Sequence, residues 1–548
     1  MNPQATVTRP FTDGSSISRN PFLCPLRRRI LLIWFCFVCR GIFYCSLLPL
    51  WDGFDEWAHF AVIERMSTAG SLLIDRNTSV SREIDASLNL VPLPRGMTFL
   101  TTQGVVREDY WKLSAEERTR READLATLPP AWSAQYPERG TPAYEASQTP
   151  LYYWLMTVPA GLLRQFPLVD RVWWLRILSF LLGSLSIPIG YTTARRFFAS
   201  ERIALGVTLA VAMLPELALT FSRISNEGLA VVVYTTLLLV GIRWVERMGL
   251  TEAIPAGVTL GFSLLTKAYA LTALPALVVA GAAIAAIDRQ RRRLVFVSTT
   301  AVVAIAMLLS SWWYVRTYVQ TGTISGLDEA IILKETSALE KLHGVSRVEW
   351  VPAIKTILAS HIWYGGWNLV GVRRWVYQFW WGVMAIVCFG FSKALFTRRD
   401  PRFYLLLSVY GLFWLGQGYQ VTALFLSKGV STSMGGWYLY SVIWAEVILA
   451  VVALRSLVTE RYQRYVFAVL LVAIAITDLY GMHSALIPYY VKDANGSWDL
   501  SRLLINQPTL LGHRGLFVLW GGYILTTLVL LVIGMFLAFK RRENSTLI

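Results

Sequence analysis

Long apolar runs separated by short polar segments dominate this sequence. Each run is close to the length that an α-helix needs to cross a bilayer, roughly 20 residues. We therefore predict an all-α polytopic membrane protein with about twelve transmembrane helices. The runs lie near residues 30–50, 172–194, 203–221, 228–245, 253–266, 269–287, 294–315, 375–396, 403–425, 437–454, 465–487 and 515–538.

One further apolar segment, "TPLYYWLMTVPAGLLRQF" at 149–166, does not fit this series. It is short, has Pro159 in its interior and ends near Arg164, so hydropathy alone does not decide whether it crosses. If it lies along the membrane surface, every basic cluster between the runs falls on one side, as the positive-inside rule requires. We therefore predict an amphipathic interfacial helix here, with the aromatic residues 152–154 at headgroup level.

The basic clusters place the remaining chain relative to the membrane. With the clusters on the cytosolic side, both termini are cytosolic, and the loops near 51–171, 317–374 and 488–514 are exterior. The clusters are Arg27/Arg28/Arg29, Arg195/Arg196/Arg202, Arg243/Arg247, Arg289/Arg291/Arg292/Arg293, Lys393/Arg398/Arg399, Arg455/Arg461/Arg464 and Lys540/Arg541/Arg542. In the first exterior loop, Ser114 followed by Glu117 has the capping-box spacing and predicts a short helix.

The composition agrees with this prediction and excludes other classes. Of the 548 residues, 55% are hydrophobic and only 16% are charged, and the mean hydropathy is +0.47; soluble proteins carry about 25% charged residues. The formal net charge of +16 does not indicate nucleic-acid binding, because the basic residues form short clusters between apolar runs. The five cysteines lie in the N-terminal tail or in apolar runs, so we expect no disulfide framework in the exterior loops.

Acidic residues crowd the point where the chain leaves the first apolar run. "LWDGFDEWAHF" contains Asp52, Asp55, Glu56 and His59 within eight residues. One interpretation is structural: Asp52 caps a helix, and the next two acids interact favourably with the positive end of the helix dipole. The alternative is a functional site at the outer membrane boundary.

Further charged residues fall on the same predicted side of the membrane. Each could simply extend its charged group to the membrane interface. Together they place bases near the acids, where an anionic lipid headgroup could meet a carboxylate. They are Arg223, Asn226 and Glu227 in "FSRISNEGLA", Lys267 in "LLTKAYAL" and Arg316 in "SSWWYVRTYV".

The order of these motifs resembles the GT-C glycosyltransferases. "DGFDEWAHFAVIERMSTAG", "YEASQTPLYYWL", "SRISNEGL", "LGFSLLTKAYAL" and "WWYVRTYVQTG" follow one another as in the branch that contains protein O-mannosyltransferases, aminoarabinose transferases and many bacterial membrane proteins. The resemblance covers roughly residues 27–326 well and the rest weakly. It departs from the pattern at Thr149, where relatives often have proline, and at Trp437, where many carry arginine; Lys428, Arg373 or Arg374 could replace that cation.

The resemblance implies a GT-C fold and a domain organisation. It implies a cytosolic tail at 1–29, which we expect to be disordered, and a transmembrane module at 30–316 that includes the exterior loop 51–171 and the interfacial helix 149–166. It further implies a second exterior loop at 317–374, a variable transmembrane module at 375–540 and a cytosolic tail at 541–548.

The resemblance also implies an enzyme of the bacterial inner membrane. It would transfer a hexose or pentose from a polyprenyl-phosphate donor, such as an undecaprenyl-phosphate sugar, to a lipid, polysaccharide or protein acceptor on the non-cytosolic face. The implied catalytic residues are Asp55, Glu56 and Glu227, and the implied phosphate-binding residues are Lys267, Arg316 and Arg223. The implied substrate-binding residues are His59, Asn226, Tyr152, Trp437 and Tyr438.

The chemistry of such a transfer is consistent with these residue types. A polyprenyl phosphate leaves as a phosphate monoester that needs charge neutralisation more than protonation, so one carboxylate base and nearby cations suffice. A single displacement inverts the anomeric configuration. Asp55, His59 and Glu227 could also bind a divalent metal ion, although a hydrogen bond from His59 to a loop carbonyl is the alternative. No other cofactor is indicated.

Two other functions remain open from the sequence. A flippase or transporter of lipid-linked sugars would also have many spans with scattered charges, although carriers usually show two related halves. An envelope polysaccharide polymerase or ligase would share the lipid carrier. Four ionisable residues inside predicted spans have no assigned partner: Arg40, Glu216, Glu446 and Asp478.

Overall fold

The computed structural model describes residues 25–539 apart from 96, 98–103, 139, 493–495 and 506. Its described elements are almost all helices, which confirms the predicted all-α class. The predicted disordered tail lies outside the described residues up to position 24, and the predicted C-terminal tail lies wholly outside them. A single pair of short parallel strands among the described elements, β1 (Pro92–Leu93) and β2 (Val105–Val106), is the one addition to the helices.

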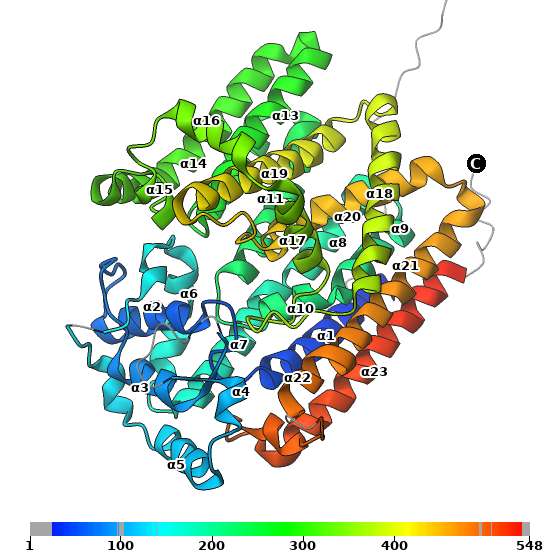
Figure 1. Ribbon diagram of the computed structural model, residues 1–548. Helices are drawn as coiled ribbons and strands as arrows, with labels where there is room; N and C mark the ends of the chain where they lie inside the picture. Colours follow the sequence, from blue (N-terminus) through cyan, green and yellow to red (C-terminus); the bar gives the residue numbers. More distant parts are fainter. Residues whose placement is uncertain are drawn as a thin grey trace, which may run out of the picture.

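The longer helices form a bundle, drawn from blue to red in Figure 1. Its members are α1 (Pro25–Leu47), α7 (Leu168–Ser184), α8 (Ser186–Phe198), α9 (Glu201–Met213), α10 (Pro215–Phe221), α11 (Glu227–Arg247), α12 (Leu250–Leu264), α13 (Ala273–Ile287), α14 (Arg292–Thr321), α18 (Arg374–Thr397), α19 (Pro401–Lys428), α20 (Ile443–Leu457), α21 (Glu460–Gly481) and α23 (Gly512–Phe539).

Shorter elements connect these helices. The α-helices among them are α2 (Glu56–Ala69), α3 (Arg82–Leu90), α4 (Arg107–Tyr110), α5 (Ala115–Ala126), α6 (Leu151–Leu162), α15 (Asp328–Ile332), α16 (Ala338–Arg347), α17 (Trp350–Ile362) and α22 (Ile487–Val491). The short 3₁₀-helices are η2 (Pro130–Ala134), η3 (Tyr144–Ser147), η4 (Ala268–Thr272), η5 (Arg289–Arg291), η6 (Gly436–Val442) and η8 (Leu500–Leu504). One π-helical turn, η7 (Met482–Leu486), follows α21.

Each of the twelve predicted runs coincides with a helix or a pair of helices. Within the described residues, nine helical segments are long and apolar enough to cross a membrane, and a tenth forms if α9 and α10 count as one span bent by 62°. The bend lies at Leu214 before Pro215, because the residue before a proline disfavours helical geometry. Helix α12, with 15 residues, is shorter, and α19 is long but outside the nine. The chain is therefore a multi-pass membrane protein.

The ambiguous segment does not form a span. Helix α6 has 12 residues, about 18 Å of helix, which is well short of the roughly 30 Å hydrocarbon core. Its Pro159 lies inside the helix, and Leu155, Val158 and Leu162 are exposed on its surface. The same exterior segment contains α5, whose N-cap Ser114 accepts a hydrogen bond from the Glu117 backbone N–H (3.2 Å), as the sequence predicts.

Several basic clusters lie beside one another at helix ends. Arg29, at the start of α1, is 3.5 Å from Glu201 at the start of α9. Arg202 donates to the backbone of Leu537 and Ala538 at the end of α23, so three helix ends meet here. At the ends of α18 and α20, Lys393 donates to Ser456 O (2.8 Å) in the same way.

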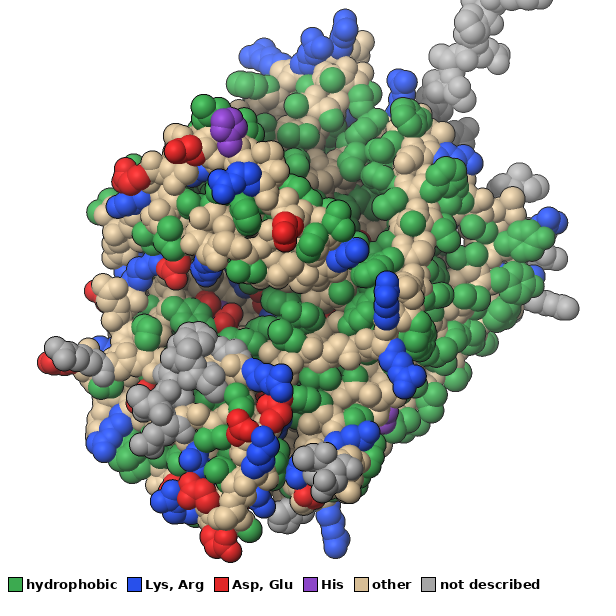
Figure 2. Space-filling view, viewed as in Figure 1, with side chains coloured by type: hydrophobic (Ala, Val, Ile, Leu, Met, Phe, Trp, Pro, Cys, Tyr) green, Lys and Arg blue, Asp and Glu red, His purple; other side chains and the backbone are tan. Residues whose placement is uncertain are grey.

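The molecule has two apolar cores. The larger one lies within the bundle, between α1, α8 to α13, α19 and α20. The smaller one packs α2, α3 and α6 against the start of α7. We call the segment from α2 to α6 the exterior unit, after the side of the membrane that the charge pattern predicts for it. Figure 1 shows this second unit at the lower left, beyond the ends of the bundle helices. Figure 2 shows hydrophobic side chains over the flank of α18, α21 and α23, and charged side chains gathered over the exterior unit.

The charges within the spans have definite partners. Arg40 in α1 pairs with Asp478 in α21 (2.8 Å), and Tyr44 donates to the other oxygen of Asp478 (2.7 Å). Glu216 accepts hydrogen bonds from the backbone N–H groups of residues 364 and 365. Glu446 is 2.9 Å from His361 of α17. These pairs tie the bundle together and fix the loop between α17 and α18.

Candidate active site

Asp55 stands at the junction of the first span and the exterior unit. It is the N-cap of α2 and has left-handed backbone geometry (φ 53°, ψ 15°), which is uncommon for a residue other than glycine and is typical of functional sites. Its Oδ1 accepts a hydrogen bond from the Tyr144 hydroxyl. Among the described residues, none hydrogen-bonds its Oδ2. Asp55 therefore presents one free carboxylate oxygen from a rigid position.

The adjacent acid has different surroundings. Glu56 is fully buried, and both of its oxygens accept hydrogen bonds from Arg176 of α7 (2.7 and 2.5 Å). Arg176 also donates to the carbonyl oxygens of residues 45, 48 and 49 at the end of the first span. The Ile224 N–H donates to Glu56 as well (3.1 Å). Glu56 thus holds the turn that carries Asp55, and it is not free to meet a substrate.

A second acid reaches the site from the start of α11. Glu227 accepts a hydrogen bond from the Lys267 ammonium group on one oxygen and from the Tyr269 hydroxyl on the other (2.9 Å). Lys267 is buried and lies 5.3 Å from the ring centroids of both Tyr269 and Tyr438. The short turn η4 places Lys267 and Tyr269 together at the outer break between α12 and α13. The hydrogen bond to Glu227 thus holds the Lys267 ammonium group in a fixed position.

Arg223 supplies a second, unpaired cation. It is 4% exposed, and among the described residues no acid or carbonyl pairs with its guanidinium group. Its guanidinium carbon lies 4.9 Å from the centroid of the Phe54 ring, directly before Asp55. A Cβ on Gly53 would come within 2.7 Å of the Arg223 side chain, so the glycine permits this close approach.

Glu145, a residue that the sequence analysis did not assign, completes the cluster from η3. It is 7% exposed, its Oε2 is buried with no hydrogen-bond partner, and this oxygen lies 3.8 Å from His59 Nδ1. Burial and the charges of Asp55 and Glu227 raise the pKa of Glu145 to about 8, against the opposing effect of Lys267. Glu145 is therefore mostly protonated near pH 7.

The charged groups of the site shift the pKa values of Asp55 and His59. Burial raises the pKa of Asp55, while the Tyr144 hydrogen bond and the charges of Arg223 and Lys267 lower it. His59 is 2.8 Å from the Tyr153 hydroxyl, and burial together with the positive charge of Lys267 keeps its pKa well below its usual value. His59 is therefore neutral near pH 7 and available for a hydrogen bond.

Aromatic rings line the side of the site that faces the second exterior loop. Trp437 of η6 stacks on Phe54 with ring centroids 4.4 Å apart, and Tyr364 lies 5.3 Å from Trp437. Tyr438 follows directly and approaches Lys267 and Tyr269. Half-buried aromatic rings of this kind suit a sugar or a prenyl chain. The loop is held there by Asp52, which accepts hydrogen bonds from Asn368 and Tyr490.

Five buried polar atoms without hydrogen-bond partners occur in the two segments that flank this cluster. Asn226 joins the segments, because its Nδ2 donates to Gln148 Oε1 (3.5 Å). Such atoms are costly unless water or a ligand satisfies them. They belong to Glu145, Thr149, Arg223, Ser225 and Asn226. Their local signal in the sequence is weak, because a lone glutamate or threonine beside "PLYYWL" does not reveal what faces it.

Several predicted site residues lie elsewhere. Tyr152 is buried and bonds Ser179 (2.7 Å), so Tyr153, its neighbour, contacts the cluster instead. Arg316 donates to the Ile74 carbonyl (3.2 Å) and lies over Trp313 (5.3 Å). The alternative cations Lys428, Arg373 and Arg374 are exposed.

Each of the three possible metal ligands has another hydrogen-bond partner. Asp55 is bonded to Tyr144, His59 to Tyr153 and Glu227 to Lys267 and Tyr269. Across the part of the chain that the structure describes, no three His, Cys, Asp or Glu side chains are grouped as metal ligands would be. Lys267 and Arg223 are buried cations at this site.

Comparison with protein-family models gives no match, and comparison with curated proteins gives none either. Among solved structures, the crystal structure of ArnT from Cupriavidus metallidurans bound to undecaprenyl phosphate is 14% identical, with 94% of this chain and 76% of that chain covered and a TM-score of 0.48. The apo structure of the same protein is 15% identical over 87% and 74%, with a TM-score of 0.40. Neither likeness assigns a role to a residue of this chain, so the roles depend on the site's own geometry.

Proposed function

We propose that this chain is a GT-C-type glycosyltransferase that moves a sugar from a polyprenyl-phosphate donor to an acceptor hydroxyl. The observation that carries the proposal is the free oxygen of Asp55 within electrostatic range of two fixed cations, Lys267 and Arg223. A base beside a phosphate-binding pair is what this transfer requires. The donor carries a hexose or pentose, and the acceptor is a lipid, polysaccharide or protein of the envelope.

In the proposed reaction, Asp55 accepts the proton of the acceptor hydroxyl as its oxygen attacks the anomeric carbon. The bond between that carbon and the phosphate oxygen breaks, and the electron pair leaves with the polyprenyl phosphate. The single displacement inverts the anomeric configuration. Tyr144 holds one oxygen of Asp55, which leaves the other directed at the acceptor.

The two cations have distinct tasks in this reaction. Lys267 is held by Glu227 and lies at the site with part of its charge neutralised. Arg223 keeps a full, unpaired charge and can form two parallel hydrogen bonds to a phosphate. As the phosphate diester becomes a monoester dianion, both interactions strengthen, which lowers the barrier.

The remaining residues bind and position. We assign the sugar to the polar groups of Glu145, His59 and Asn226, and the aromatic faces of Trp437 and Tyr438 to the sugar or the first prenyl units. Glu56 acts through the turn it holds and is a positioning residue. We place the protein in a bacterial inner membrane with cytosolic termini and with the site on the outer face, because the basic clusters lie at the opposite end of the spans.

The test is a transfer assay with purified full-length protein in detergent or nanodiscs. Radiolabelled polyprenyl-phosphate sugars are incubated with an envelope lipid extract, and labelled product is measured for the wild type, Asp55→Asn and the control Asp124→Asn. Asp124 is an exposed residue of α5 in the same exterior loop. We expect transfer to fall by about 10²- to 10⁴-fold in Asp55→Asn and to stay unchanged in the control.

A second measurement separates this function from lipid transport. Proteoliposomes with labelled donor in the inner leaflet report movement of the lipid to the outer leaflet. Donor movement without sugar transfer, unaffected by Asp55→Asn, would overturn the proposal in favour of a flippase.

A further inference from the structure

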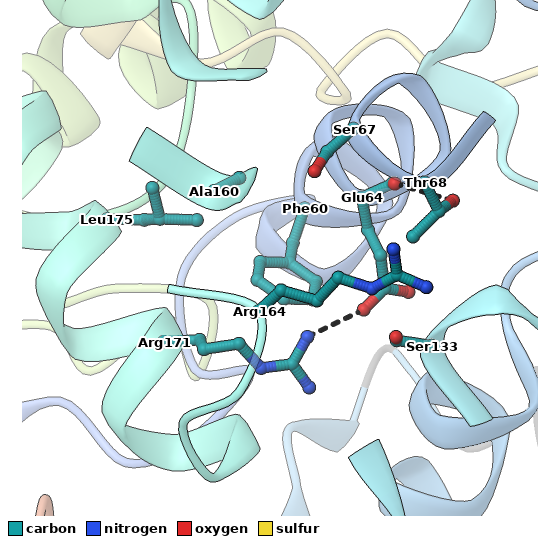
Figure 3. A pocket seen from close by; sticks show the side chains of 9 residues that line it. All are labelled: Phe60, Glu64, Ser67, Thr68, Ser133, Ala160, Arg164, Arg171 and Leu175. Atoms are coloured by element: carbon teal, nitrogen blue, oxygen red, sulfur yellow. Dashed lines mark hydrogen bonds and ion pairs between the residues drawn. The ribbon is translucent and has the colours of Figure 1, made fainter. Parts of the chain in front are cut away.

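Buried ion pairs in this protein hold different elements together. Arg171 pairs with Glu64 (3.0 Å), drawn as a dashed line in Figure 3, and joins α7 to α2. His361 pairs with Glu446 (2.9 Å) and joins α17 to α20. The second pair also contacts η6, the short helix that carries two aromatic rings of the candidate active site. This contact connects a buried charge to the placement of those rings.

The imidazole ring of His361 has an acceptor at each of its two nitrogens. Nδ1 lies 3.1 Å from the carbonyl oxygen of Gly436, and Nε2 lies 2.9 Å from Oε1 of Glu446. A carbonyl oxygen and a carboxylate oxygen both need an N–H, and only the doubly protonated ring donates from both nitrogens. His361 is 8% exposed, so its charge is buried beside that of Glu446. The geometry therefore favours an imidazolium at this position.

The groups around the ring agree with this protonation state. The acids Glu446 of α20 and Glu216 of α10 act on it, and Tyr440 of η6 stacks on it with ring centroids 4.8 Å apart. Burial opposes a positive charge on His361, but the two acids and the hydrogen bonds of the ring outweigh burial and raise its pKa above the usual value. An ordinary histidine has a pKa of about 6.5 and is mostly neutral at pH 7.

Gly436 is held at both of its backbone groups by two adjacent residues of α17. Its N–H donates to Ser360 Oγ (2.7 Å), and its carbonyl oxygen accepts from His361. We call these two hydrogen bonds the Gly436 clamp. A Cβ on this glycine would lie 2.0 Å from the Ile357 carbonyl oxygen, so only glycine lets η6 approach the backbone of α17 this closely. The Tyr440 hydroxyl adds a third bond, to the His361 carbonyl (2.6 Å).

The clamped end of η6 leads directly into the candidate active site. Trp437 and Tyr438 follow Gly436 in the same 3₁₀-helix. Trp437 stacks on Phe54, and the ring of Tyr438 lies 5.3 Å from the Lys267 ammonium group. A shift of Gly436 would move both rings, because each is attached to the next residues of the same short helix. The placement of these two rings therefore depends on the clamp.

We propose that a positively charged His361 holds the carbonyl of Gly436 and thereby positions the aromatic rings of η6 for the lipid-linked donor. Its role toward the donor rests on the proposed function, whereas the clamp itself does not. His361 does not touch the donor, so it is a positioning residue. A hydrogen bond from an ionised donor is about twice as strong as a neutral one. Loss of the proton would leave one of the two acceptors without its N–H.

The protonation state of His361 tests the proposal without any substrate. The full-length protein with ¹⁵N-labelled histidine is studied in lipid bilayers by solid-state NMR at pH 7. The signals of His361, one of five histidines, are assigned from their absence in His361→Gln. We expect both ring nitrogens to carry a proton in the wild type and only Nδ1 in Glu446→Gln, whose amide can donate to Nε2. An unprotonated ring nitrogen in the wild type would overturn the proposal.

Two uncharged replacements separate the two bonds of the ring. The amide of His361→Asn takes the place of Nδ1 and can donate to Gly436, whereas the longer His361→Gln reaches Glu446 instead. Both variants lose the same charge, so they differ mainly in the bond they keep. We expect amide hydrogen exchange in residues 436–442 to be about fivefold faster in His361→Gln than in His361→Asn. Equal rates in the two variants would contradict the clamp. The control is His343→Gln, an exposed histidine of α16.

Kinetics connect the clamp to the donor. In the transfer assay we expect His361→Gln to raise KM for the polyprenyl-phosphate sugar about tenfold and to change kcat by less than about threefold, because the rings bind the donor and do not react. His361→Asn should keep most of the wild-type affinity. A fall in kcat with an unchanged KM would overturn the role in donor binding. If the wild type transfers no sugar, the proposed function fails, while the NMR and exchange results still decide whether the clamp exists.

Discussion

Two groups of charges in this protein have opposite surroundings. Inside the bundle, both oxygens of Asp478 are occupied, one by Arg40 and one by Tyr44, and all three side chains are fully buried. At the outer boundary, Asp55 keeps a free oxygen, and Arg223 has no acid partner among the described residues. Both groups use the same residue types, and they differ in how completely those residues are paired.

The difference separates structural charges from functional ones. A buried charge is tolerated when its partners replace the hydrogen bonds it made to water, as in the Arg40–Asp478 pair. Charges left unpaired cost free energy that water or a ligand can recover. In the proposed function, the outer group lowers the stability of the empty protein and that cost is recovered when the charged donor binds.

The largest expected effect comes from breaking the buried Arg40–Asp478 pair. Asp478→Asn should lower the free energy of unfolding by about 3–5 kcal/mol, because the Arg40 charge is left buried without its counter-charge. Thermal denaturation in detergent measures this loss. The double variant Arg40→Met/Asp478→Leu should recover most of it, since neither charge remains. Asp55→Asn should not destabilise the protein, and a comparable loss of stability there would refute the distinction between the two groups.

The next effect is the pH dependence of stability that the buried Glu145 carboxyl produces. The pKa of Glu145 is about 8 in the folded protein and near 4.5 in an unfolded chain. Between these values the folded state holds a proton that the unfolded state has lost, so this group makes stability fall as pH rises. The effect is on the order of 5 kcal/mol across the window.

Glu145→Gln cannot ionise and should remove that slope. We expect the variant to match the wild type near pH 5 and to denature at a higher temperature at pH 8. Denaturation curves at both pH values check the difference, with Glu138→Gln, an exposed glutamate in the same loop, as the control. Identical slopes in wild type and Glu145→Gln would exclude a raised pKa at this position.

A smaller effect distinguishes the two outer cations. Arg223→Gln should reduce sugar transfer by roughly 10- to 100-fold, the effect of losing one charged donor to a phosphate, with little change in stability. Lys267→Met should reduce both transfer and stability, because it leaves Glu227 without its cation. Paired measurements of transfer rate and denaturation temperature test this contrast. A strong destabilisation by Arg223→Gln would show that the arginine has a structural partner.

The smallest effect concerns the loop that covers the outer group. Glu216 accepts the backbone N–H groups of Tyr364 and Gly365, and Glu216→Gln keeps an acceptor there but loses its charge. We expect a loss of about 1 kcal/mol in local stability, seen as faster amide hydrogen exchange in residues 363–372. Unchanged exchange there would show that the Trp437 and Asp52 contacts alone hold the loop.

Much of the fold follows from the sequence because it depends on local composition. Run length predicted the long helices of the bundle, and the proline and short length of 149–166 predicted a segment that does not span; the helices agree with both. The site was harder to predict. The motif order drew attention to Asp55, Glu227 and Lys267, which the structure brings together, but it also suggested Arg316 and Tyr152, whose contacts lie elsewhere.

What the sequence by itself determined is where the chain forms long apolar helices, since hydropathy acts within about twenty neighbouring residues. What only the tertiary structure decided is which charges are paired. Asp55 and Glu56 are adjacent, yet one is free and the other is bound to Arg176, 120 positions away. The pairing of Arg40 with Asp478, 438 positions distant, and the free oxygen of Glu145 among the described residues arise in the same way. Pairing depends on distances between side chains on different helices, which packing alone sets.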